Sequence, residues 1–139
     1  MLPLIFNTME LHIKIIGYLF ILLAFVHVIF PKKFEWKKEC GSLSLINKQM
    51  MYIHTFFIAL VVLLMGILCI TSYTELINTP LGRKISLGFF IFWVIRFFIQ
   101  FFGYSSELWR GKQFETLVHI IFSIFWAYVS VVFFIAYWY

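Results

Sequence analysis

The segment FFIALVVLLM, residues 56–65, has no charged or amide side chain and no alternation of apolar and polar residues. A membrane-spanning β-strand would alternate, so this segment excludes a barrel. The pattern is typical of a helix that is apolar on every side. The apolar run extends from residue 50 to residue 71. Since about 20 residues of helix cross the hydrocarbon core of a bilayer, we expect a transmembrane helix here.

Three further stretches have the same character, at residues 13–30, 85–103 and 114–138. Together the four stretches use most of the 139 residues, of which 63% are hydrophobic and 12% are charged. This composition excludes a soluble globular protein, a disordered chain, a nucleic-acid-binding domain and a disulfide-stapled secreted module. The sequence therefore predicts one all-α domain over residues 1–139, an integral membrane four-helix bundle.

Proline and glycine punctuate the predicted helices. Pro31 is expected to end the first helix, because proline cannot extend the ladder of helical hydrogen bonds. Pro80 and Gly82 are expected to break the chain in a hairpin between the second and third helices. Residues 1–10 are expected to form a short lead at the membrane interface. The first apolar stretch has no small-residue cleavage site before Pro31, so we interpret it as a retained helix rather than a signal peptide.

The run KKFEWKKE, residues 32–39, mixes lysines with aromatic side chains. Such a run is predicted to form a short helix on the membrane surface, with Phe34 and Trp36 at the depth of the lipid headgroups. Cys40 and Cys69 are not spaced as a CxxC motif and would lie at opposite membrane surfaces. They therefore predict no disulfide.

The distribution of Lys and Arg predicts an orientation. Segments 31–49 and 104–113 contain seven of these residues, against three at the opposite ends of the helices. The seven are Lys32, Lys33, Lys37, Lys38, Lys48, Arg110 and Lys112, and the three are Lys14, Arg83 and Lys84. The positive-inside rule then places both segments in the cytoplasm and both termini on the outer side. We expect an integral membrane location in a bacterial inner membrane.

Three histidines, one arginine and one glutamine lie inside the apolar stretches. They are His27, His54, Arg96, Gln100 and His119. Ionisable groups are costly in lipid, so they usually face the interior of a bundle and mark function. At 1.5 Å per residue, all five lie within roughly 10 Å of the same predicted membrane boundary. Small and hydroxyl residues share the helix faces of His27, Arg96, Gln100 and His119, as at helix contacts in membranes, and His54 flanks such a face. The sequence predicts a polar pocket between the four helices, near the cytoplasmic boundary.

Glu115 extends this pattern, because it precedes His119 by four residues and shares its helix face. A carboxylate in that position would orient the imidazole or pair with Arg96 across the bundle. Glu107, Arg110 and Lys112 are expected at the rim of the pocket.

Our first functional hypothesis is a redox cofactor or a metal. Histidines on facing helices are the usual ligands in helical bundles. Two of His27, His54 and His119 would ligate a b-type haem, with Arg96 and Gln100 in the binding site. Alternatively, the three histidines and Glu115 would bind zinc, copper or iron. Either arrangement suits electron transfer or a redox accessory role.

Three other functions remain open. An oligomeric transporter or channel would use Arg96 and the histidines to bind a small anion or to carry protons. A quinone or lipid-headgroup site would use Glu115 and His119 as acid and base. A non-catalytic subunit of a membrane complex would use the polar layer for helix packing alone, with Arg96 extended to the headgroups. The chain has no Asp, which excludes aspartate-based mechanisms. The expected partners are the lipid bilayer, further copies of the chain or a larger membrane complex, and no nucleic acid.

Overall fold

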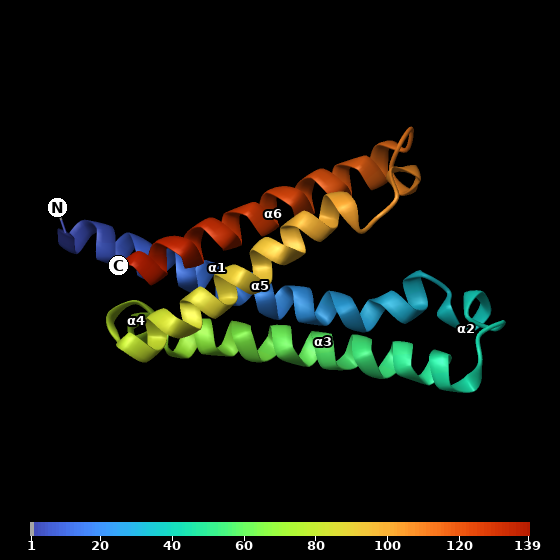
Figure 1. The fold of residues 1–139 in the computed structure, drawn as a ribbon, viewed down its shortest axis with the longest axis horizontal. Helices are drawn as coiled ribbons and strands as arrows, with labels where there is room; N and C mark the ends of the chain where they lie inside the picture. The colour runs from blue at the N-terminus through green and yellow to red at the C-terminus, as the bar shows by residue number, and fades with distance from the viewer. Residues whose placement is uncertain (1) are drawn as a thin grey trace. The chain divides into compact units, whose positions relative to one another are not determined.

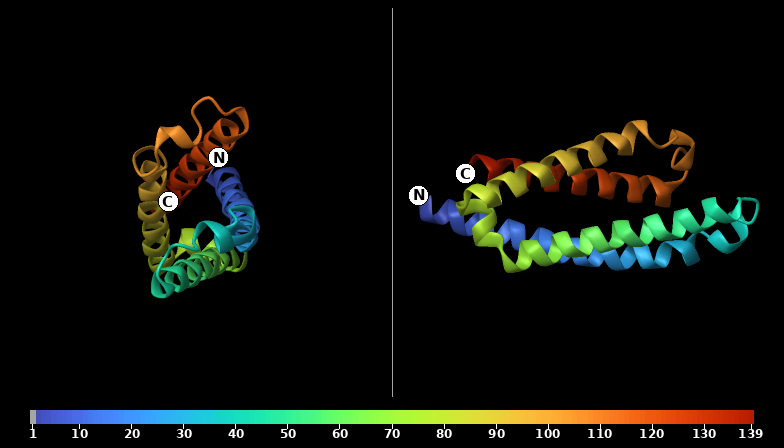
Figure 2. Two further views of the ribbon diagram at one scale, coloured as in Figure 1. Left: turned by 90° about the vertical axis from the view of Figure 1, so that its right-hand side faces the viewer. Right: turned by 60° about the horizontal axis from the view of Figure 1, so that its bottom comes forward.

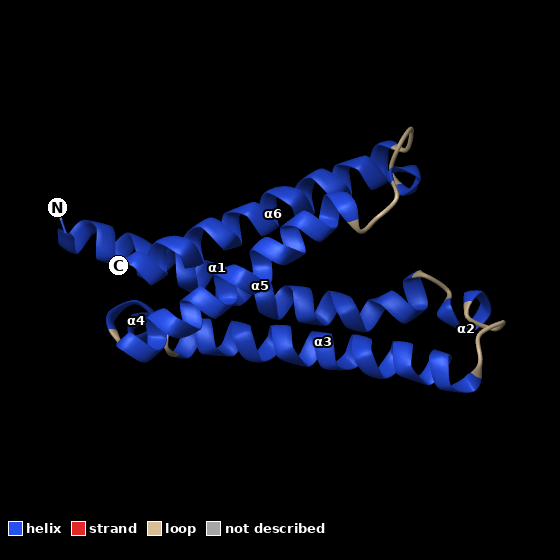
Figure 3. Cartoon of the chain, in the orientation of Figure 1, coloured by secondary structure: helices blue, strands red, loops and turns tan. Residues whose placement is uncertain are grey.

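The computed structural model describes the backbone of residues 2–139 and the side chains from Thr8 onward, and this part of the chain contains no strand (Figures 1 and 3). The helices are α1 (Leu2–Lys33), α2 (Trp36–Glu39), α3 (Leu45–Thr71), α4 (Tyr73–Asn78), α5 (Pro80–Phe102) and α6 (Gln113–Trp138), with a 3-10 turn, η1, at Ser106–Leu108. Helices α1, α3, α5 and α6 are long and apolar enough to cross a membrane. The prediction of an all-helical chain with four such helices is confirmed.

Helix α1 differs from its predicted bounds at both ends. It begins at Leu2, so most of the expected interfacial lead is helical. It also continues through Pro31 to Lys33. Proline has no backbone N–H, so it removes one helical hydrogen bond. Near the end of a helix this loss affects only the last turn. The chain beyond it still closes a helical bond, from the Phe34 N–H to the Phe30 carbonyl at 2.9 Å.

The predicted break between the second and third spans is also wrong in detail. Pro80 is the first residue of α5, a position that favours proline because its N–H would have no helical partner. The Thr79 side chain caps this helix: its hydroxyl donates to the Glu75 carbonyl at 2.8 Å and accepts from the Gly82 N–H at 2.9 Å. Gly82 lies within α5, where a Cβ would collide with the Glu75 carbonyl of α4. These residues start and pack a helix instead of interrupting one.

The chain divides into two compact units, Leu11–Tyr73 and a second unit made of Thr74–Tyr139 with the N-terminal residues up to Glu10. In the unit 11–73, α1 and α3 lie side by side (Figure 2). Their backbones meet at two glycines, since a Cβ on Gly66 would be 2.8 Å from the Gly17 carbonyl oxygen. Close approach at small residues is the usual way in which membrane helices pack.

The predicted surface helix around Trp36 is shorter than expected. Helix α2 covers only Trp36–Glu39, because Lys32 and Lys33 belong to α1. The Trp36 ring packs edge-on against Tyr52 of α3, with ring centres 5.3 Å apart. This contact holds α2 to the start of α3.

In the second unit, α5 and α6 pack side by side (Figure 1). Aromatic rings fill the contact. Trp93 and Trp126 stack with ring centres 4.9 Å apart and planes within 9° of parallel, and Phe89 meets Phe133 edge-on at 5.1 Å. The buried Ser86 hydroxyl donates to the Leu76 carbonyl of α4 at 3.1 Å, which ties α4 to α5.

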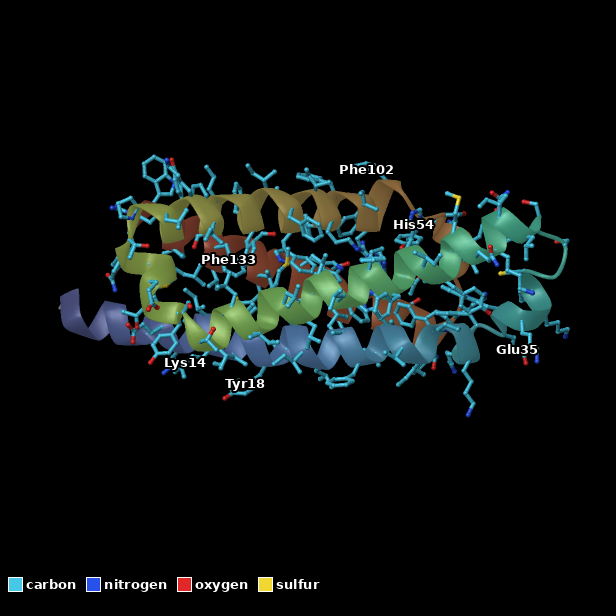
Figure 4. The ribbon with its side chains drawn as sticks, turned by 90° about the horizontal axis from the view of Figure 1, so that it is seen from below. Lys14, Tyr18, Glu35, His54, Phe102 and Phe133 are labelled. Atoms are coloured by element: carbon cyan, nitrogen blue, oxygen red, sulfur yellow. The ribbon has the colours of Figure 1, made fainter. Side chains whose placement is uncertain are left out.

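Large apolar and aromatic side chains also cover the outside of the helices. Tyr18 of α1 and Phe102 of α5 point away from the ribbon and are 64% and 85% exposed (Figure 4). Extensive exposure of such side chains is unfavourable in water and ordinary in lipid. The surface therefore agrees with the membrane location that the composition indicates.

Candidate functional site

The predicted polar residues are divided between the two units. His27 and His54 belong to the unit 11–73, and Arg96, Gln100, Glu115 and His119 belong to the unit of α5 and α6. The pocket shared by four helices stays a prediction. Within the second unit the structure does bring three of the residues together.

Arg96, Gln100 and His119 form a hydrogen-bonded chain across α5 and α6. Arg96 and Gln100 are four residues apart on α5, which places them one above the other on one face. The Arg96 Nη1 donates to the Gln100 Oε1 at 3.1 Å. The Gln100 Nε2 lies 2.9 Å from the His119 Nδ1 of α6. Gln100 is only 8% exposed, so this polar link is inside the unit.

The direction of these bonds follows from the guanidinium group, which can only donate. Arg96 requires an acceptor, so Gln100 presents its oxygen to Arg96 and its NH₂ group to His119. The His119 Nδ1 must then accept, and a neutral His119 ring carries its proton on Nε2. A single charged side chain thus sets the tautomer of a histidine on the neighbouring helix.

The His119 ring is held by the segment that joins α5 to α6. The indole of Trp109 stacks on the imidazole, with ring centres 3.9 Å apart and planes within 9° of parallel. Phe101 meets the same ring edge-on at 5.5 Å. The Thr116 hydroxyl donates to the Trp109 backbone carbonyl at 2.7 Å, which ties the backbone at Trp109 to the first turn of α6. These contacts restrict rotation of the imidazole.

Arg96 is half-buried, and aromatic rings supply much of its surroundings. Its guanidinium carbon lies 5.1 Å from the ring centre of Trp126 and 5.6 Å from that of Tyr104. Both distances are within the range of cation–π attraction. The indole N–H of Trp126 is buried and has no hydrogen-bond acceptor among the described residues. The cluster therefore holds one cation and, at Trp126, a buried N–H donor without an acceptor in the described part of the chain.

Glu115 makes neither of its two predicted contacts. It is exposed in the first turn of α6, and its carboxylate pairs with no group among residues 8–139, whose side chains the structure describes. A carboxylate at this position interacts favourably with the helix dipole without any side-chain partner. Gln100, rather than Glu115, connects Arg96 to His119.

The two histidines of the other unit have different surroundings. The His27 Nδ1 lies 2.8 Å from the Leu23 carbonyl, which can only accept, so this nitrogen carries a proton, and in the neutral ring Nε2 has the lone pair. That is the form in which histidine binds a metal or haem iron. His54 is exposed on α3 (Figure 4).

The donor set around His119 does not fit a metal ion. Its Nδ1 is occupied by Gln100, its Nε2 carries the proton, and the Arg96 charge lies one hydrogen bond beyond. Across residues 2–139, no three His, Cys, Asp or Glu side chains are grouped so that they could hold a metal. The proposed ligand set of His27, His54, His119 and Glu115 is thus not supported as one centre.

The sequence placed Thr116 on the helix face of His119 but did not identify Trp109 or Tyr104 as part of this cluster. Tyr104 follows Gln100 by four residues, a spacing that would have placed it on the face of Arg96 had the helix been extended by one turn. Trp109 lies in a connecting segment, where no periodic pattern indicates a side-chain direction. No family model, curated protein or solved structure matches the chain.

Proposed function

We propose that this protein binds a small anion at Arg96, within the unit of α5 and α6. The observation that carries the proposal is that Arg96 has no carboxylate partner in the described part of the chain. Its guanidinium bonds the neutral amide oxygen of Gln100 and faces two aromatic rings. A positive charge in an apolar span is costly unless an opposite charge accompanies it. A bound anion supplies that charge.

The chemistry of the cluster favours an oxyanion. A guanidinium group is a planar fork of N–H donors that matches two oxygens of a carboxylate, nitrate or phosphate. Gln100 engages only Nη1 of this fork. The guanidinium lies over the Trp126 ring, and the buried indole N–H of that ring has no acceptor among the described residues.

The anion has two possible sources, a dissolved small anion or the phosphate of a lipid headgroup. Arg96 lies six residues before the end of α5 at Phe102, which is about 9 Å along a helix. A long side chain at that depth reaches headgroups as well as water. The chemistry is the same in both cases, so the test must separate the sources.

Of the functions that the sequence predicts, transport of a small anion suits this cluster best. Several copies of the chain would assemble to enclose the transport pathway. For the orientation, we propose that segments 31–49 and 104–113 face the cytoplasm of a bacterial inner membrane. Seven cationic residues in these segments, against three at the other side, support this.

The test uses ¹⁵N-labelled protein in lipid-free detergent micelles. Sodium nitrate is added at constant ionic strength, and the Arg96 side-chain and Trp126 indole N–H resonances are followed by NMR. We expect saturable shifts of both resonances. They should disappear in Arg96→Gln and persist in Arg83→Gln, which removes the same charge near the start of α5.

A parallel titration with phosphatidylglycerol separates the two sources. Shifts with nitrate that phosphatidylglycerol neither reproduces nor reverses indicate a dissolved anion. Shifts that phosphatidylglycerol reproduces, with or without a response to nitrate, indicate a lipid headgroup. If neither probe moves the two resonances while the protein retains its helical circular dichroism, the proposal is wrong.

A further inference from the structure

Gln100 joins Arg96 to His119 through bonds that all run in one direction, from the guanidinium to the amide and from the amide to the imidazole. This arrangement requires that the His119 Nδ1 be an acceptor. A second proton on the ring turns Nδ1 into an N–H donor. Two donors, Nδ1–H and the Gln100 NH₂, would then face each other at a separation suited to a hydrogen bond.

The amide has no orientation that satisfies both neighbours of this charged form. If the amide keeps its orientation, the contact with His119 is lost. If it turns by half a rotation, its oxygen accepts from His119 and its NH₂ group opposes the Arg96 donors. In the second case the Arg96 Nη1 gives up its bond to Gln100 and becomes available to a ligand. Protonation of His119 thus makes Arg96 a better anion receptor.

We propose that the site takes up its anion together with one proton, which His119 accepts at Nδ1. This inference rests on the proposed function. With His119 neutral, Arg96 gives the cluster one positive charge. The proton adds a second, and the bound anion returns the total to one. Anion and proton then bind cooperatively, and each increases the affinity for the other by the same factor.

The surroundings of His119 leave the anion as its counter-charge. From α5 it faces Gln100, with Arg96 beyond, and from the connecting segment it faces the uncharged Trp109. The other nearby ionisable groups are exposed. Glu115 lies one turn earlier on α6, and Tyr104 lies beside Arg96. The remaining ones, in the connecting segment, are Glu107, Arg110 and Lys112. None of these carboxylates contacts the imidazole within the described residues.

Trp109 keeps the ring in place in both protonation states. A flat stack at 3.9 Å supports the neutral imidazole by packing and the charged one by cation–π attraction. The change on protonation is therefore expected at the Gln100 amide, which lies on the edge of the imidazole rather than on its face.

The experiment measures the dissociation constant of nitrate between about pH 5 and pH 8, the range in which histidine commonly titrates. Nitrate stays an anion throughout, so any dependence on pH belongs to the protein. One proton per anion makes the dissociation constant fall, as the pH falls, by up to about tenfold per pH unit. His119→Gln should flatten this dependence, and His54→Gln, on the exposed face of α3, should preserve it.

A second measurement needs no variant, in case His119→Gln fails to fold. The ring ¹⁵N resonances of His119 are titrated with and without nitrate, and nitrate should move their midpoint to higher pH. Nitrate binding that is independent of pH, with an unmoved midpoint, would overturn the coupling and leave the proposed function standing. Absence of binding of both nitrate and phosphatidylglycerol at every pH would remove both.

Discussion

When neutral, His27 and His119 carry their ring protons on different nitrogens, and in each case the partner of Nδ1 is the cause. The Leu23 carbonyl can only accept, so it requires a proton on the Nδ1 of His27. The Gln100 NH₂ group can only donate, so it requires a lone pair on the Nδ1 of His119. The two residues are therefore chemically distinct, although both are histidines in apolar helices.

We predict that the ¹⁵N shifts of the two neutral rings report opposite tautomers. At a pH where both rings are neutral, His27 should show a protonated Nδ1 and His119 a protonated Nε2. In Gln100→Leu, the His119 ring loses its donor and should shift toward a mixture of tautomers, while His27 is unchanged. Finding the same tautomer at both positions in the unmodified protein would contradict the hydrogen-bond chain through Gln100.

The sequence predicted part of this site, for reasons of spacing. Arg96 and Gln100 are four residues apart, and such pairs share a helix face whatever the helix packs against. The same rule associates Glu115 with His119, and there it misled. Glu115 is stable in the exposed first turn of α6, and only the packing of α5 on α6 places the Gln100 amide at the imidazole instead.

At the scale of whole helices, apolar length predicted four spans and their approximate positions, because the bilayer sets that length. The termini were harder to predict. Pro31 and Pro80 have the same side chain, yet one lies in the last turn of a helix and the other at the first residue. The position of Pro80 depends on the Thr79 cap and on α4. A rule that treats proline as a helix breaker does not take such neighbours into account.

Gly66 provides a test at this scale, because it separates packing from helix propensity. A Cβ at this position would lie 2.8 Å from the Gly17 carbonyl oxygen, whereas a Cβ at Gly88 of α5 would meet no atom within 4 Å. We expect Gly66→Ala to destabilise the protein by about 1–3 kcal/mol through overpacking. Gly88→Ala should be neutral or stabilise α5 by up to about 1 kcal/mol.

The measurement is reversible unfolding in mixed micelles, followed by circular dichroism. Comparable stability changes in the two variants would show that α1 and α3 do not meet at the two glycines. A larger loss in Gly66→Ala than in Gly88→Ala supports the close crossing.

For the whole molecule, the composition determined the class of protein and the charges suggest its orientation. Four apolar helices return the chain to the side on which it began, so both connecting segments 34–44 and 103–112 should lie on one side of the membrane. The seven cationic residues in and beside them favour the cytoplasm. The uneven distribution of charge favours one orientation because each Lys or Arg near a helix end resists transfer across the membrane.

Single cysteines test this orientation in a variant without Cys40 and Cys69, both of which are buried and form no disulfide. Ser42→Cys, Ser106→Cys and Asn78→Cys each place a thiol at an exposed position. In intact bacterial cells, a membrane-impermeant maleimide should label Asn78→Cys alone. The two serine variants should react only after the membrane is opened. Labelling of both serine variants in intact cells would reverse the orientation, and labelling of only one of them would rule out four crossings.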